Sequence, residues 1–182
     1  MFKKTEKNNK TPSAPRPDPR QGAVEGQKAR RPRVFIATGA SGGHIFPGLA
    51  IASVLRREGY WCTFVGSAKQ FSVHIKEQGF DIIPLPAKQF NVSGVLPKLQ
   101  SLKTVSQAYL KALKLIRSHK PVAVLGMGSY ASVATVLAAK TLGVPTLIHE
   151  QNPRPGRANR FLARFVDKVL LAFDEARLHL PH

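Results

Sequence analysis

Six short apolar runs, separated by glycines and by stretches with a helical period, constrain the fold of this 182-residue chain more than any other feature. The runs are apolar throughout rather than alternating, which predicts strands that are buried on both faces. We expect them at 34–38, 61–65, 81–85, 122–125, 145–149 and 168–172. Strands of this kind that alternate with helices predict an α/β fold with a doubly wound, mostly parallel sheet.

The stretches between the runs predict the connecting helices. Pro47 is expected to open the first helix, and Gly59 to end it. In the longest stretch, 97–119, apolar residues recur every three or four positions, which is the helical period. Further helices are expected at 68–78, 131–142 and 157–165, with an irregular loop at 87–97.

Residues 1–32 have a different composition from the rest of the chain. They are rich in proline, lysine and arginine and show no apolar period, so we predict a disordered basic tail ahead of one domain at 33–182. No apolar core follows the first basic residues, so we do not expect a secretory signal peptide. A transit peptide has little support because serine is scarce in the tail.

Charge indicates the class of partner. The chain has 28 Lys and Arg against 10 Asp and Glu, a net charge of +18, which favours a polyanionic partner such as nucleic acid, anionic lipid or a phosphorylated substrate. No apolar run approaches the roughly 20 residues that span a bilayer. The single cysteine, Cys62, lies in an apolar run and is expected to be a buried thiol, as in proteins of a reducing compartment.

The first loop expected at the carboxyl end of a strand reads T-G-A-S-G-G-H-I-F-P, from Thr38 to Pro47. Gly42 and Gly43 allow a ligand to approach the backbone closely, and the N–H groups at the start of a helix favour phosphate. Ser41 adds a hydroxyl, and His44 adds a ring that titrates near neutral pH. The alternative is a tight turn without a ligand.

Two familiar phosphate-binding motifs do not fit this loop. A dinucleotide fingerprint needs glycine where Ser41 and His44 stand, and no acidic residue ends the second strand. A P-loop needs G-K-[ST], which the loop lacks.

The second and third loops also carry polar groups. In L-G-M-G-S-Y-A-S, Gly128 ends a strand and Tyr130 and Ser132 begin a helix, where hydroxyls could bind a sugar or a diphosphate; a packing turn is the alternative. In H-E-Q-N-P-R-P-G-R-A-N-R, four polar residues follow a buried run, and buried polar groups need partners. Glu150 could orient His149 or act as a base.

Together the three motifs closely resemble the lipid II-forming N-acetylglucosaminyl transferases of bacterial peptidoglycan synthesis, glycosyltransferase family 28. The resembling motifs are G-x-[ST]-G-G-H-x-x-P, G-x-G-x-Y-x-S and H-E-Q-N-x-x-x-G-x-x-N, and the match runs from about Val34 to Phe173. The resemblance implies a Rossmann-like sheet that forms the N-terminal half of a GT-B glycosyltransferase. It also implies a carboxy-terminal donor-binding domain that this sequence does not contain.

The resemblance implies a reaction and its participants. N-acetylglucosamine passes from UDP-N-acetylglucosamine to the C4 hydroxyl of muramic acid on lipid I, with inversion, at the cytoplasmic face of the bacterial inner membrane. The candidate catalytic residues are His44, Tyr130, His149 and Glu150. The candidate substrate-binding residues are Ser41, Gly42, Gly43, Gly128, Ser132, Asn152 and Asn159. No cofactor is expected, and no metal site, because the histidines lack ligand spacing.

Departures from the family pattern are few. Ala40 and Ser41 stand where the family usually has glycine and threonine, and Ser129 stands where a third glycine is common. Serine for threonine keeps the hydroxyl.

A membrane-facing edge is expected at the start of the long helix. Apolar residues there are ringed by lysines, a pattern typical of segments that lie in the headgroup layer. The residues are Val95, Leu96, Lys98, Leu99, Leu102 and Lys103. The alternative is the start of a core helix.

Two other functions remain open at this point. The chain could be one subunit of a split transferase that works with a separate donor-binding domain, or a non-catalytic lipid- or phosphate-binding domain. Nucleic acid is not expected, because aromatic residues are not interleaved with the basic ones.

Overall fold

The computed structural model describes residues 31–67, 69–85 and 95–181, with the backbone alone for residue 69 and residues 95–102. The predicted basic tail lies outside the described residues apart from Arg31 and Pro32, and so does most of the predicted loop at 87–97.

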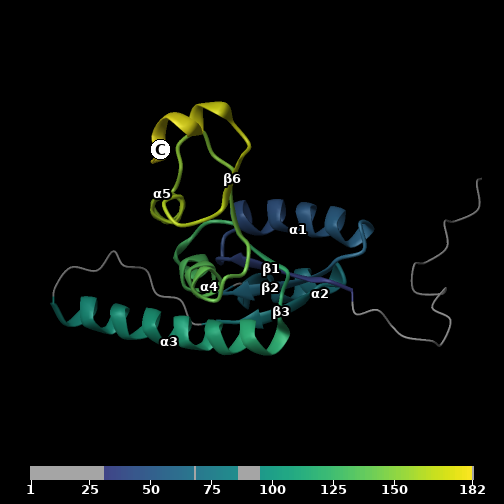
Figure 1. Ribbon diagram of the computed structural model, residues 1–182, viewed down its shortest axis with the longest axis horizontal. Coiled ribbons are helices and arrows are strands. Elements are labelled where there is room, and N and C mark those ends of the chain that lie inside the picture. Colours follow the sequence, from purple (N-terminus) through teal and green to yellow (C-terminus); the bar gives the residue numbers. More distant parts are fainter. Residues whose placement is uncertain (1–30, 68, 86–94, 182) are drawn as a thin grey trace, which may run out of the picture. The chain divides into compact units, whose positions relative to one another are not determined.

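A parallel sheet of six strands forms the centre of the domain (Figure 1). Its strands are β1 (Arg33–Thr38), β2 (Trp61–Gly66), β3 (Asp81–Pro84), β4 (Ala123–Gly126), β5 (Thr146–Glu150) and β6 (Lys168–Leu171). Their order is β3-β2-β1-β4-β5-β6, and every neighbouring pair is parallel. This is the order of a doubly wound Rossmann-like sheet, so the predicted fold class is confirmed.

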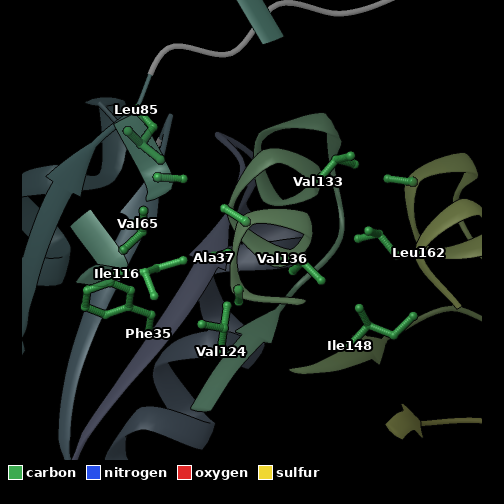
Figure 2. Close-up of a cluster of buried hydrophobic side chains, with 14 residues drawn as sticks. Phe35, Ala37, Val65, Leu85, Ile116, Val124, Val133, Val136, Ile148 and Leu162 are labelled. Atoms are coloured by element: carbon green, nitrogen blue, oxygen red, sulfur yellow. The ribbon is translucent and has the colours of Figure 1, made fainter. Parts of the chain in front are cut away.

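Alternate residues of the strands face two separate cores. On β1, Val34 and Ile36 contribute to one core, whereas Phe35 and Ala37 contribute to the other. Both faces of the sheet are therefore covered, as the apolar strands predicted. Figure 2 shows the second core, where Phe35 and Val124 of the sheet meet Ile116 and Val136 of the helices.

Helices cover the two faces of the sheet. Helix α1 (Gly42–Arg57) and helix α2 (Ser72–Glu77), with a short 3-10 turn at Lys69–Phe71 before it, contribute to the core of Val34 and Ile36. Helices α3 (Val95–His119), α4 (Tyr130–Thr141) and α5 (Arg157–Leu162) contribute to the core of Phe35 and Ala37. A 3-10 helix at Asp174–His179 follows β6. None of the helices in the described part of the chain is long and apolar enough to cross a membrane.

The start of helix α1 differs from the prediction. The helix begins at Gly42 rather than at Pro47, which lies inside it. The carbonyl of Ser41 accepts the N–H groups of His44 and Ile45, both at 3.1 Å, so the first turn forms on the glycines. Because proline has no N–H, the Gly43 carbonyl lacks its helical donor. Gly42, Gly43 and His44 are thus the first turn of a helix rather than a loop.

Two smaller differences concern the segments beside β2 and β5. The helix predicted at 68–78 is divided into the 3-10 turn and α2. The helix predicted at 157–165 ends at Leu162.

Candidate functional site

Three polar loops follow three neighbouring strands. Strands β1, β4 and β5 lie side by side in the sheet and end at Thr38, Gly126 and Glu150. Between β1 and β4 the direction of winding reverses, and ligands of open α/β sheets bind beyond the carboxyl ends of the strands at this switch point. The order of the strands therefore brings the three predicted loops to one edge.

The first loop leads into α1 and presents His44. The Ser41 hydroxyl and His44 Nδ1 are hydrogen-bonded, which orients the imidazole. A Cβ atom added to Gly128 would lie 3.1 Å from His44 Nε2, so this nitrogen faces the second loop. Gln70 donates its side-chain N–H to the Ala40 carbonyl and fixes the turn before the helix.

Burial changes the titration of the two histidines of the site. Partial desolvation lowers the pKa of His44 below its usual 6.5, and the nearby Glu150 carboxylate opposes the shift. Burial lowers the pKa of His149 in the same way, again against Glu150. Both imidazoles are consequently neutral at pH 7 and able to accept a proton.

The second loop turns tightly between β4 and α4. A Cβ atom on Gly126 would lie 2.9 Å from Val136 Cγ2, so the close packing of α4 on the sheet requires glycine. Gly128 has φ +89°, a conformation that glycine adopts without strain. Ser132 is fully buried and donates its hydroxyl to the Ser129 carbonyl at 2.8 Å, so this hydroxyl stabilises the start of α4.

The third loop is organised around the carboxylate of Glu150, which is 1% exposed. Its Oε1 accepts the backbone N–H and the side-chain N–H of Asn152, both at 3.0 Å. Its Oε2 accepts the Gly156 N–H at 3.0 Å and the Asn159 side chain at 2.9 Å. All four of these bonding groups are donors, which is the arrangement that an ionised carboxylate requires. Glu150 therefore sets the course of the loop from β5 to α5.

A further hydrogen bond joins the second and third loops. Gln151 donates its side-chain N–H to the Met127 carbonyl at 2.7 Å. Asn159 also donates to the His149 carbonyl at 3.0 Å, so α5 is tied to the end of β5. The second and third loops are thus held together by side chains of the H-E-Q-N segment and its downstream asparagine.

A cavity of about 250 Å³ lies among the loops. Its wall includes several residues that the sequence singled out: His44, Gly128, Tyr130, Glu150, Asn152 and Asn159. Ser129, Gly156, Arg157 and Ala158 complete the wall, and the sequence did not single them out as site residues. Ser41, Gly42, Gly43, Ser132 and His149 are not part of this wall. Ser41 still contributes through its bond to His44.

Three buried polar atoms of these loops have no hydrogen-bond partner within the described residues. They are Ser129 Oγ, His149 Nδ1 and Asn159 Oδ1. Buried polar atoms are nearly always paired in folded proteins, and ordered water or a ligand supplies the partner where the chain does not. Ser129 and Asn159 line the cavity, so two of these atoms belong to residues of its wall, whereas His149 does not line it.

The predicted membrane edge can be followed only in part. Val95 begins α3, and the side chains of Val95, Leu96, Lys98, Leu99 and Leu102 lie outside the described residues. Lys103 is exposed on α3. No group of three or more potential metal ligands occurs among the residues that the structure describes.

Comparison with known proteins gives consistent results. The profile of the glycosyltransferase family 28 N-terminal domain matches residues 34–171. The UDP-N-acetylglucosamine–N-acetylmuramyl-(pentapeptide) pyrophosphoryl-undecaprenol N-acetylglucosamine transferase of Shewanella pealeana is 37% identical over 148 residues, which are 81% of this chain and 40% of the relative. The protein of the same name from Bdellovibrio bacteriovorus is 39% identical over 150 residues, 81% of this chain and 42% of the relative.

Solved structures agree on the fold. The crystal structure of MurG from Acinetobacter baumannii superposes with a TM-score of 0.71 at 30% identity and covers 83% of this chain and 43% of that protein. A UDP-GlcNAc 2-epimerase from Methanocaldococcus jannaschii, 14% identical with a TM-score of 0.57, covers 81% of this chain and 41% of that protein and supports the fold alone. This chain spans about two fifths of the length of the relatives it matches. The predicted half of a GT-B fold is confirmed, and the chain belongs to glycosyltransferase family 28, in which it corresponds to the N-terminal domain.

Proposed function

We propose that this chain forms the lipid-acceptor half of an inverting N-acetylglucosaminyl transferase. The donor is UDP-N-acetylglucosamine and the acceptor is the muramic acid of lipid I, the substrates that the names of the relatives state. The observation that supports this most is the cleft at the switch point, where helix starts, a neutral histidine and unpaired polar atoms occur together.

The diphosphate of the acceptor is proposed to bind where α1 and α4 begin. Each helix start carries N–H groups that have no helical partner, together with the positive end of the helix dipole. Gly43 is exposed, and a Cβ atom there would meet nothing within 4 Å, so a phosphate can approach this backbone. The two helix starts together supply roughly +1 elementary charge, which offsets part of the negative charge of the diphosphate.

His44 is the group we propose as general base. It lines the cavity, whereas His149 does not, and its lowered pKa leaves it neutral at pH 7. If Nδ1 carries the proton and donates it to the Ser41 hydroxyl, Nε2 is free to accept a proton. In the reaction the C4 oxygen of muramic acid attacks the anomeric carbon of the donor sugar, the bond to UDP breaks, and Nε2 takes the hydroxyl proton.

Glu150 and Asn152 are proposed to position the substrate rather than to accept a proton. Both oxygens of Glu150 already accept two hydrogen bonds each, so the carboxylate positions Asn152 at the wall of the cleft. Asn152 then faces the donor sugar. Tyr130 and His149 remain proposed contacts of the acceptor.

A transfer assay tests the proposed activity. The full chain is incubated with labelled UDP-N-acetylglucosamine and a lipid I analogue, with and without the donor-binding part of the Bdellovibrio relative. We expect labelled lipid II when the donor-binding part is present and a large loss of rate in His44→Gln, with Glu58→Gln as a control on the opposite end of α1. Binding of the analogue without any product would instead assign the chain to the non-catalytic lipid-binding function.

The chain is also proposed to lie on the inner face of the bacterial inner membrane. Helix α3 contains no Asp or Glu over 95–119, and Lys103, Lys111, Lys114 and Arg117 are exposed on it. Each basic side chain near an anionic leaflet contributes about 1 kcal/mol. Flotation with vesicles of anionic lipid should retain the full chain, and a chain without residues 1–32 should be retained less; equal retention would refute a role for the tail.

A further inference from the structure

Ser129 has an unusual backbone conformation for a residue with a side chain. It lies just before α4 with φ 73° and ψ 159°, a region that residues other than glycine rarely occupy. Lys120 is the one other non-glycine residue with positive φ in the described part of the chain. Glycine at position 129 would adopt this conformation without strain. The fold by itself therefore favours glycine over serine here.

The hydroxyl of Ser129 does not compensate for this strain within the protein. Serine before a helix usually accepts a backbone N–H of the first turn through its Oγ, but Ser129 makes no such bond. Its backbone carbonyl instead accepts the Ser132 N–H at 3.2 Å and the Ser132 hydroxyl at 2.8 Å. Ser129 Oγ is buried, and no hydrogen-bond partner for it occurs among the residues that the structure describes. Strain, an unused cap and an unpaired hydroxyl all disfavour serine at this position.

The location of the Ser129 hydroxyl indicates that a ligand could offset the destabilising effects of serine at this position. Ser129 lines the cavity, and a Cβ atom added to Gly39 would lie 2.3 Å from Ser129 Oγ. The hydroxyl therefore lies between the turn after β1 and the start of α4. Asn159 lines the same cavity, is 1% exposed and has an unpaired Oδ1. The Ser129 hydroxyl can donate to a phosphate oxygen, whereas Asn159 Oδ1 only accepts and would pair with a hydroxyl or N–H group of a ligand.

We propose that Ser129 is a further ligand-binding residue, whose hydroxyl donates a hydrogen bond to an oxygen of the bound diphosphate. The inference rests on the proposed function, because the diphosphate is that of the acceptor. The Ser129 hydroxyl lies beside the N–H groups at the start of α4, so one phosphate oxygen can accept hydrogen bonds from the hydroxyl and from an N–H group. A hydrogen bond to a charged oxygen is stronger than one to a neutral group. The hydrogen bond in the complex thus offsets the free energy that the unliganded protein loses to the strained backbone and the unpaired hydroxyl of Ser129.

The test compares stability and affinity in three proteins: the full wild-type chain, Ser129→Gly and Ser129→Ala. The probe is farnesyl diphosphate, a soluble prenyl diphosphate, with inorganic diphosphate as a second probe that separates a lipid-linked from a free ligand. Binding is measured by titration calorimetry in about 0.15 M salt, where distant charges are screened. Thermal unfolding is measured without ligand.

We expect the two measurements to move in opposite directions. Ser129→Gly should unfold about 2–4 °C higher than wild type because the strain is removed. Both variants should bind farnesyl diphosphate about tenfold or more weakly because the donor is lost. Lys120→Gly is the matched control, since it also relieves a positive φ but lies at the connection from α3 to β4. It should raise the unfolding temperature and leave the affinity unchanged.

The outcomes separate this inference from the proposed function. Affinity within twofold of wild type in both variants would overturn the role of Ser129 while the proposed function stands. Weaker binding by Ser129→Gly alone would also overturn it, because the backbone rather than the hydroxyl would then matter. No saturable binding by the wild-type chain would contradict the proposed function and the role of Ser129 with it.

Discussion

The carboxylate of Glu150 offers the sharpest test of how the cleft is built. Glu150→Gln keeps the size of the side chain but replaces one of its two acceptor oxygens with an NH₂ group. In either orientation of the amide, two of the four donors on Asn152, Gly156 and Asn159 then face another donor. The remaining two bonds change from charged to neutral acceptors.

The expected loss follows from these bonds. A hydrogen bond to a charged group contributes about 1.5–3 kcal/mol, so losing two removes about 3–6 kcal/mol before any relaxation. Asn152 and Gly156 are exposed, and water can replace part of what they lose. We therefore expect the free energy of unfolding to fall by about 2–4 kcal/mol.

Two measurements distinguish a local from a general effect. Urea unfolding followed by circular dichroism gives the free energy of unfolding, and hydrogen exchange of the Gly156 amide reports on the loop directly. Glu58→Gln, at the exposed end of α1, is the control and should stay within about 0.5 kcal/mol of wild type. A Glu150→Gln variant as stable as the control, with an equally protected Gly156 amide, would refute the anchoring role.

Other predictions concern titration, glycines and the thiol. Because burial lowers the pKa of His44 and His149 below 6.5, the unfolded chain binds more protons below that pH, so stability should fall as the pH falls from about 7.5 to 5.5. In a variant with both histidines changed to glutamine, the free energy of unfolding from urea melts should depend less steeply on pH. An unchanged pH dependence would contradict this. Gly66→Ala should destabilise by about 2–4 kcal/mol, because φ is +144° and the new Cβ would lie 2.0 Å from a backbone oxygen of β1. Gly43→Ala, which meets nothing within 4 Å, should leave stability unchanged or raise it by up to about 1 kcal/mol; similar urea midpoints for the two variants would refute the contrast. Burial raises the pKa of the Cys62 thiol to about 11, so iodoacetamide at pH 8 should label the native chain far more slowly than the unfolded chain, and equal rates would show that the thiol is accessible.

The strands were predictable because burial on both faces leaves an uninterrupted apolar run. Val34–Thr38 is an example, and its residues divide between the two cores in the structure. The start of α1 was not predictable in this way, because Gly42 and Gly43 resemble a loop. Their helical conformation depends on the Ser41 carbonyl and on tertiary packing, and intrinsic helix propensities do not account for either.

The location of the cleft was predictable from the ends of the strands, whereas the hydrogen bonds that hold its loops were not. Polar residues after β1, β4 and β5 indicated the loops that line the cavity. The partners of Glu150 lie up to nine positions away, on two backbone N–H groups and on two asparagine side chains, and sequence spacing does not define such a loop. The strained conformation of Ser129 has no sequence signature beyond the serine that follows Gly128.

Binding of a soluble, fluorescent lipid I analogue to the full chain, measured by anisotropy, tests the central claim most directly. Gly43→Ala is the informative variant, because its new methyl group would lie in open space where the diphosphate is proposed to approach. The account predicts saturable binding by wild type that the variant weakens about tenfold or more, at undiminished stability. No saturable binding by wild type, or equal affinity of the two proteins, would contradict it.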